Sequence, residues 1–138
     1  MIEPAYAHIL MVEDRDDAFY IVQDILIHDV GVRSCLRCRD GRSLIDFVDT
    51  RAVGLVDLIL YNIKRPLRDD FALIPTLRLH PKLINARIVA LTANIMPDDV
   101  ERTHNAGFDG FIGIPIDQER FISQIQRVLN DELVWEPR

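Results

Sequence analysis

The chain has 138 residues, close to the usual size of one domain, and 49% of them are hydrophobic, enough to bury a core. A formal net charge of −6 argues against nucleic acid as the main partner, and no apolar run approaches the ~18 residues of a membrane span. The first residues lack the basic and apolar regions of a signal peptide, so we expect a soluble, cytoplasmic protein that does not contact a membrane.

Strands and helices are predicted to alternate, because short apolar runs are followed each time by a stretch whose apolar residues have helical spacing. The predicted strands are 8–12, 32–37, 56–61, 87–91 and 110–113, and the predicted helices are 17–28, 42–50, 70–79, 98–106 and 118–130. The first, third and fourth strands are nearly continuous runs of Ile, Leu and Val, typical of parallel strands covered on both faces. We therefore predict an α/β fold with a five-stranded parallel sheet, doubly wound, over residues 1–131, followed by a short tail, 132–138.

Acidic residues stand near several predicted helix starts, where a short side chain can accept a hydrogen bond from a free backbone N–H. Asp16 or Asp17 is the candidate cap of the first helix, and Asp117 of the last. Asp69 and Asp70 are better placed to cap the third helix than to act in a site.

Function in sheets of this kind gathers beyond the carboxyl ends of the central strands. The residues predicted there are Glu13, Asp14, Asn62, Thr92, Ile114 and Pro115. No glycine-rich phosphate loop follows any strand, which disfavours a nucleotide enzyme, and no histidine stands at triad-like spacing from a nucleophile. We expect neither a catalytic activity nor an organic cofactor.

Asn62 stands where an acidic nucleophile would be expected, at the end of a buried strand and before the loop Ile63-Lys64-Arg65-Pro66. An aspartate there could attack phosphorus and form an acyl phosphate, whereas an amide oxygen is a poor, uncharged nucleophile. Asp57 lies five residues earlier, so it points to the opposite face about 16 Å away along the strand. We therefore predict that no other acid replaces the nucleophile.

Four segments, in order and at consistent spacing, resemble the receiver domain of two-component response regulators, the CheY-like family with a flavodoxin-like fold. They are the first strand with its acidic pair, 9–14, the phosphoacceptor strand and loop, 57–66, the threonine strand with its loop, 90–93 and 98–99, and the last strand with its proline turn, 106–117. The resemblance covers residues 8–129. It implies that Glu13 and Asp14 hold Mg²⁺, that Thr92 binds the phosphoryl group, and that Phe111 is an aromatic switch.

Two positions depart from the family pattern. The phosphoacceptor is Asn62, and the expected lysine before Pro115 is Ile114, although the resemblance still implies a cis bond there. Losing one partner of a buried ion pair costs about 3 to 5 kcal/mol, whereas replacing both by neutral groups is often harmless. We therefore hypothesise a pseudo-receiver in which the pocket is repacked without these charges and phosphorylation is abandoned.

The remaining pocket residues each admit two interpretations. Glu13, Asp14 and the Asn62 amide oxygen could form a weak Mg²⁺ site, but an unoccupied acidic pocket is favoured. Without phosphate, Thr92 is expected to satisfy local backbone groups, and Phe111 is expected to be a core aromatic residue.

The leading functional hypothesis is a protein-binding module in two-component or phosphorelay signalling, with a sensor kinase, a phosphotransfer protein or an output regulator as partner. The alternatives are a receiver that titrates a histidine kinase or phosphotransfer protein by docking on it, and a weakly Mg²⁺-binding regulatory domain. The resemblance implies a contact or homodimer surface on the fourth helix, fifth strand and fifth helix, and an ordinary solvated face is the alternative. Its polar residues are Asp98, Asp99, Glu101, Arg102, Gln118, Arg120, Gln124 and Arg127.

The two cysteines and the single tryptophan are not assigned to the predicted site. Cys35 and Cys38 form a lone C-x-x-C pair at a strand end, without a second pair for zinc, so we expect two reduced structural cysteines. Trp135 is the only tryptophan and lies in the tail, where it could pack on the body of the domain or dock on another subunit.

Overall fold

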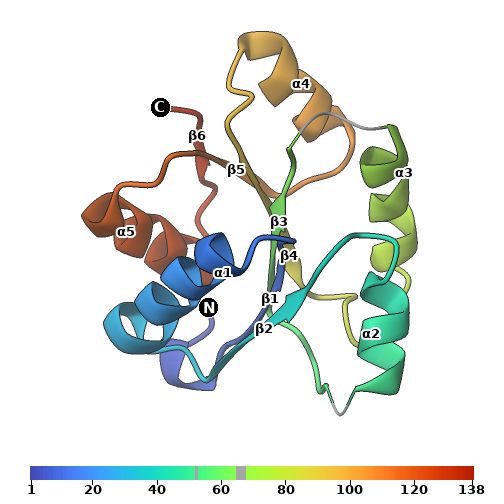
Figure 1. Ribbon diagram of the computed structural model, residues 1–138, viewed down its shortest axis with the longest axis vertical. Coiled ribbons are helices and arrows are strands. Elements are labelled where there is room, and N and C mark those ends of the chain that lie inside the picture. Colours follow the sequence, from blue (N-terminus) through green and yellow to red (C-terminus); the bar gives the residue numbers. More distant parts are fainter. Residues whose placement is uncertain (52, 65–67) are drawn as a thin grey trace.

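The computed structural model describes residues 1–51, 53–64 and 68–138, with only the backbone of residues 68 and 69 (Figure 1). Its centre is a six-stranded parallel sheet in the order β2-β1-β3-β4-β5-β6. The strands are β1 (His8–Val12), β2 (Ser34–Cys38), β3 (Leu58–Asn62), β4 (Arg87–Thr92), β5 (Gly110–Gly113) and β6 (Trp135–Glu136). The helices are α1 (Asp16–Asp24), α2 (Leu44–Thr50), α3 (Arg68–Leu77), α4 (Pro97–Asn105) and α5 (Gln118–Leu129), with the short turns η1 (Pro4–Tyr6) and η2 (Ile25–Val30).

The predicted α/β alternation and parallel sheet are confirmed, but the prediction of five strands is wrong. Trp135 and Glu136 form a sixth strand, β6, in parallel register with Phe111 and Ile112 of β5. Two residues are too few to show a period of two, so no alternation in the sequence marked them as a strand. Their pairing depends on the edge that β5 presents, which is a property of the folded sheet.

Two layers of helices cover the sheet. Figure 1 shows α1 and α5 together on one side and α2 and α3 on the other. Side chains alternate across the sheet along each strand, so Ile9 and Met11 of β1 face the layer of α1 and α5, and Leu10 and Val12 face the layer of α2 and α3. This double burial explains why β1, β3 and β4 are nearly continuous apolar runs.

The helix starts agree only in part with the predicted caps. Asp117 caps α5, with Oδ1 accepting a hydrogen bond from Arg120 N at 3.0 Å. The cap prediction for α1 is wrong, because Arg15 holds the cap position and both Asp16 and Asp17 lie in the first turn. Negative charge in that turn still favours the helix, since the unpaired N–H groups carry partial positive charge.

The turn after α5 is held from two directions. The Met1 ammonium pairs with Asp131 Oδ2 at 2.5 Å, and Arg87 Nη2 pairs with Asp131 Oδ1 at 2.7 Å. Asp131 has a φ of 64°, which turns the chain back toward the sheet edge. These contacts direct residues 132–138 along β5.

None of the helices in the part of the chain that the structure describes has the length and apolar character of a membrane span.

Candidate functional site

A pocket of about 260 Å³ opens at the carboxyl ends of β1 and β3, as predicted for a sheet of this topology. Its walls include Glu13, Asp14, Asn62, Lys64 and Asp70. Asp57 lies at the other end of the sheet, where its Oδ2 accepts a hydrogen bond from His8 N at 2.8 Å. Arg65 and Pro66 of the predicted phosphoacceptor loop, and the side chain of Asp69, fall outside the described residues.

Asn62 binds the buried carboxylate of Glu13. Its Nδ2 donates to Glu13 Oε1 at 3.1 Å and to Oε2 at 3.0 Å, and Glu13 is only 2% exposed. An ionised carboxylate can only accept, so the amide nitrogen has to face it. Burial raises the pKa of Glu13, while the positive charge of Lys64 and the bond from Asn62 oppose that rise. The amide therefore satisfies a buried acid that an aspartate could not.

Lys64 supplies the positive charge at the mouth of the pocket. Its Nζ forms an ion pair with Asp14 Oδ1, and this hydrogen bond lowers the pKa of Asp14. Glu13 and Asp14 are the residues that could hold a divalent cation, but one is bound by the Asn62 amide and the other by an ammonium. A cation would have to displace both donors, so this set of side chains fits poorly with the Mg²⁺ that the resemblance implies.

Thr92 is tied into the loop that follows β4. It is buried, and its Oγ1 accepts hydrogen bonds from Asn94 N at 3.0 Å and Asn94 Nδ2 at 3.3 Å. The same Asn94 Nδ2 donates to Lys64 O at 3.0 Å, which links the two loops around the pocket. The hydroxyl thus accepts a hydrogen bond from a local backbone N–H group. Asn94 was missed, because one asparagine in a loop carries no signal of its own.

Ile114, which stands where the resemblance leads us to expect a lysine, has apolar surroundings. The Ile114–Pro115 peptide bond is cis, as the resemblance implies, and Ile114 N donates to Thr92 O at 3.0 Å. The half-buried Ile114 side chain packs against the core beneath α1 and α5. An uncharged side chain in this place leaves no ammonium from β5 to neutralise a phosphoryl group.

A second polar contact, not predicted, closes the wall of the pocket on the α3 side. The hydroxyl of the buried Tyr61 donates to Asp70 Oδ1, and burial followed by this bond raises the pKa of Tyr61. The sequence predicts Asp70 as a candidate cap of α3, but the helix begins at Arg68, and the Asp70 side chain reaches back to β3. The one signal for this contact was a hydroxyl at the end of an otherwise apolar strand, because a buried Tyr needs a partner.

Comparison with known proteins decides the family. A model of the response regulator receiver domain matches residues 9–126. The chain belongs to this family. It is 27% identical over 123 residues to the polar-differentiation response regulator DivK of Brucella anthropi, covering 89% of this chain and 96% of that protein.

Solved structures agree with the assignment. The signal receiver domain of a histidine kinase from Syntrophus aciditrophicus is 29% identical, with a TM-score of 0.71 and 91% of each chain covered. The chemotaxis response regulator CheY4 of Vibrio cholerae has the same fold, with a TM-score of 0.73 at 22% identity, covering 89% of this chain and 98% of that one. The resemblance stated from the sequence motifs, and with it a role in two-component signalling, is confirmed.

The surface expected on α4, β5 and α5 of this receiver is only partly open. Arg120, Gln124 and Arg127 all contact Glu136 of β6, and Gln124 is buried. Phe111, to which the resemblance gives the role of an aromatic switch, is fully buried with Trp135 stacked over it. Of the residues expected on this surface, Gln124 is therefore not accessible, and the side chains of Arg120 and Arg127 are paired with the C-terminal tail.

The other half of that expected surface is closer to the prediction. Asp98, Glu101 and Arg102 are exposed on α4, with Arg102 Nη2 paired to Asp99 Oδ1 at 2.8 Å. At the start of α5, Gln118 Nε2 donates to Asp29 Oδ2 at 3.0 Å.

Both cysteines are free and buried, as expected for structural residues. Burial raises the pKa of the Cys35 thiol to about 12, so it is not a reactive thiolate at neutral pH.

Proposed function

We propose that this receiver acts in two-component or phosphorelay signalling by binding a protein partner, without phosphorylation of an aspartate and without catalytic activity. The observation that carries the proposal is the contact between Asn62 and Glu13. The side chain at the acceptor position presents its amide nitrogen to a buried acid, and neither end of an amide is an effective nucleophile toward phosphorus.

The second departure supports the same proposal. With Ile114 in place of the lysine, the charges of the acceptor aspartate and of its lysine are both absent. Aspartate and lysine cancel, so their joint replacement leaves the sum of charges in the pocket unchanged. A buried pair replaced on both sides by neutral groups leaves no uncompensated charge, which makes the two substitutions compatible with a stable fold.

The partner we propose is a sensor kinase, a phosphotransfer protein or an output regulator that recognises the receiver surface. A receiver that docks on a kinase or phosphotransfer protein without accepting phosphate would reduce the amount of that partner available to other receivers. Pairing of two copies through α4, β5 and α5 is a weaker candidate, because β6 lies over the β5 edge of that surface.

The proposal is tested by intact mass. The protein is incubated with Mg²⁺ and acetyl phosphate beside a phosphorylation-competent receiver, and beside the variant Asn62→Asp/Ile114→Lys. We expect no addition to the wild-type chain, against an addition of about 80 Da to the competent receiver. An addition of about 80 Da to the wild-type chain contradicts the proposal, and a shift of about 1 Da shows that Asn62 has deamidated to aspartate.

A further inference from the structure

The C-terminal segment Leu133–Arg138 is seated on β5 in the manner of a bound peptide. Phe111 N donates to Val134 O at 2.8 Å, Trp135 and Glu136 pair in register with β5, and Val134 is 1% exposed. This is the pattern by which an extended peptide adds a strand to a sheet edge: main-chain bonds provide affinity, and alternate side chains provide specificity.

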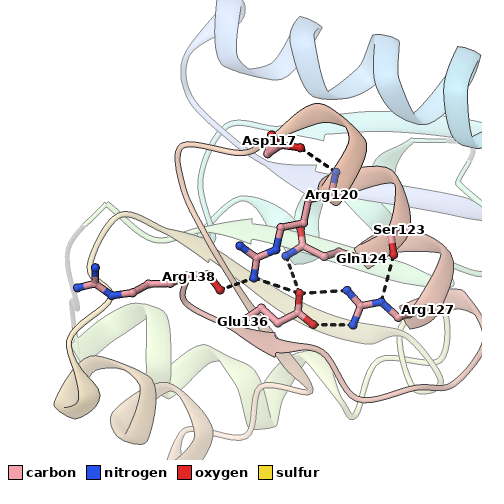
Figure 2. A network of polar contacts seen from close by, with 7 residues as sticks. All are labelled: Asp117, Arg120, Ser123, Gln124, Arg127, Glu136 and Arg138. Carbon is pink, nitrogen blue, oxygen red and sulfur yellow. Dashed lines mark hydrogen bonds and ion pairs between the residues drawn. The ribbon is translucent and has the colours of Figure 1, made fainter.

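The glutamate of the segment meets a polar row along α5 (Figure 2). Arg127 reaches both oxygens of Glu136, with Nη1 to Oε2 at 2.5 Å and Nη2 to Oε1 at 3.0 Å. Gln124 Nε2 donates to Oε1 at 3.0 Å, and Arg120 Nη2 approaches the same oxygen at 3.4 Å. Such bidentate Arg–carboxylate pairs add geometric specificity as well as energy, so this row selects an acid at that position.

The aromatic residue of the segment has a matching site. Trp135 stacks on Phe111, with ring centroids 6.4 Å apart and an angle of 20° between the planes. The rings of Trp135 and His104 of α4 meet edge to face, with centroids 5.1 Å apart. Beyond it, a groove of about 740 Å³ between α4 and the segment is lined by Ile95, Met96 and Val100. Tryptophan is enriched at interfaces where one end of the side chain is in an apolar environment and the other reaches water.

The backbone of β5 is shaped to admit this segment. A Cβ on Gly113 would overlap the carbonyl oxygen of Pro137, and a Cβ on Gly110 would lie 2.9 Å from the carbonyl oxygen of Val134. Glycines inside a strand weaken it and mark places where another backbone approaches closely. Both glycines of this four-residue strand face the C-terminal segment.

We propose that β5 and the Arg120, Gln124 and Arg127 row of α5 form a strand-addition site, occupied in this chain by its own Leu133–Arg138 as a built-in ligand. The partner that fits it is a protein with an extended apolar–aromatic–acidic segment, the chemistry of Val134-Trp135-Glu136. This inference rests on the proposed role in protein binding and names the partner's recognition element. Because a tethered segment has an effective concentration of order mM, a partner binds only when the chain's own segment is released.

The test uses the whole 138-residue chain, in which Trp135 is the only tryptophan. In Trp135→Phe/Glu136→Lys the segment is released, because a lysine is repelled by Arg120 and Arg127, and the protein contains no tryptophan. The peptide Leu-Val-Trp-Glu-Pro-Arg is then titrated in and followed by its own tryptophan emission and anisotropy. We expect it to bind this variant roughly tenfold or more tightly than it binds Trp135→Phe, whose segment stays docked.

Two controls distinguish the loss of the Glu136 contacts from a change in the net charge of the protein or the peptide. Trp135→Phe/Glu132→Lys makes the same charge change outside the Glu136 contacts and should bind no better than Trp135→Phe. The peptide with lysine in place of glutamate should bind neither Trp135→Phe nor Trp135→Phe/Glu136→Lys.

Equal affinity for the released and docked variants, or no binding to the released variant up to about 5 mM peptide, overturns the proposal, since a ligand of this site should bind at the mM effective concentrations typical of a short tether. A circular dichroism spectrum showing that Trp135→Phe/Glu136→Lys is unfolded would overturn it as well, because β6 would then be part of the fold and not a ligand. None of these results bears on the pocket of Asn62, whose phosphorylation is decided separately by intact mass.

Discussion

The amide of Asn62 has two ends with opposite properties, and the fold uses the donor end. Glu13 is 2% exposed, and leaving its carboxylate without a donor would carry the full cost of an unsatisfied buried charge. An aspartate at the same place can pair with Glu13 only through a proton or a metal ion. Asn62 is thus a residue that stabilises the folded chain through its contact with Glu13.

Asn62→Asp should therefore destabilise the protein. We expect the free energy of unfolding at pH 7 to fall by about 2 kcal/mol, because a hydrogen bond to a charged group is lost and a second negative charge faces Glu13. Adding Ile114→Lys should recover part of this loss by restoring a positive charge. Urea denaturation of the three proteins measures both effects.

The matched control for this substitution is Asn85→Asp, the same change on an exposed residue, expected to stay within about 0.5 kcal/mol of wild type. Equal stability of Asn62→Asp with and without Ile114→Lys would contradict the coupling between the two positions.

The sequence was informative about which residues line the pocket and less informative about how they pair. Glu13, Asp14 and Asn62 could be placed because each lies at the end of a strand in a sheet whose carboxyl ends converge. The pairing of Tyr61 with Asp70 could not, because it depends on the position that α3 takes relative to β3, which is a matter of tertiary packing.

The bounds of strands and helices could likewise be predicted only in part from the sequence. β1 and β5 have the predicted bounds, 8–12 and 110–113, since each is a short apolar run that ends at polar or turn residues. The predicted helix 17–28 is divided between α1 and the π-helical turn η2, which is followed by the capping residue Gly31 with a φ of 84°. The side-chain pattern of one apolar stripe is common to both parts, so the change of backbone winding left no sign in it.

The turn before α2 holds Gly41 against the ring of Tyr61, where a Cβ would overlap the phenol oxygen. We expect Gly41→Ala to lower the free energy of unfolding by about 1 to 3 kcal/mol, because the ring and its bond to Asp70 must shift. Chemical denaturation measures the change.

Gly54→Ala is the comparison, because a Cβ at Gly54 meets nothing within 4 Å. It should be neutral or slightly stabilising through its effect on the unfolded chain. A Gly41→Ala variant as stable as Gly54→Ala would show that the turn adjusts without cost.

The sheet as a unit has a strong centre and a weaker edge. β3 lies between β1 and β4 and is buried on both faces by the two helix layers, whereas β6 contributes two residues at the edge. Local openings in proteins need less free energy than global unfolding wherever few buried contacts are lost. The order of opening across the sheet should follow this difference.

Native-state hydrogen exchange checks that order. The amide of Phe111, which is bonded to Val134 O, should exchange by a local opening of β6, and the amides of β3 only by global unfolding. In Glu136→Gln, the Phe111 amide should exchange about tenfold faster, since the charge-assisted bonds from Arg127 are weakened, and β3 should change far less. Equal acceleration at both places would mean that β6 opens only with the rest of the sheet.

Cys35 and Cys38 are three residues apart on β2, so one thiol points into the layer beneath α1 and α5 and the other into the layer beneath α2 and α3. The strand itself keeps the two sulfur atoms on opposite sides, and oxidation cannot join them while β2 is intact. Each thiol therefore reports separately on one side of the sheet. The rate at which it is alkylated measures how often the helix layer that covers it opens to solvent. The ratio of the two rates shows which of the two layers opens more often.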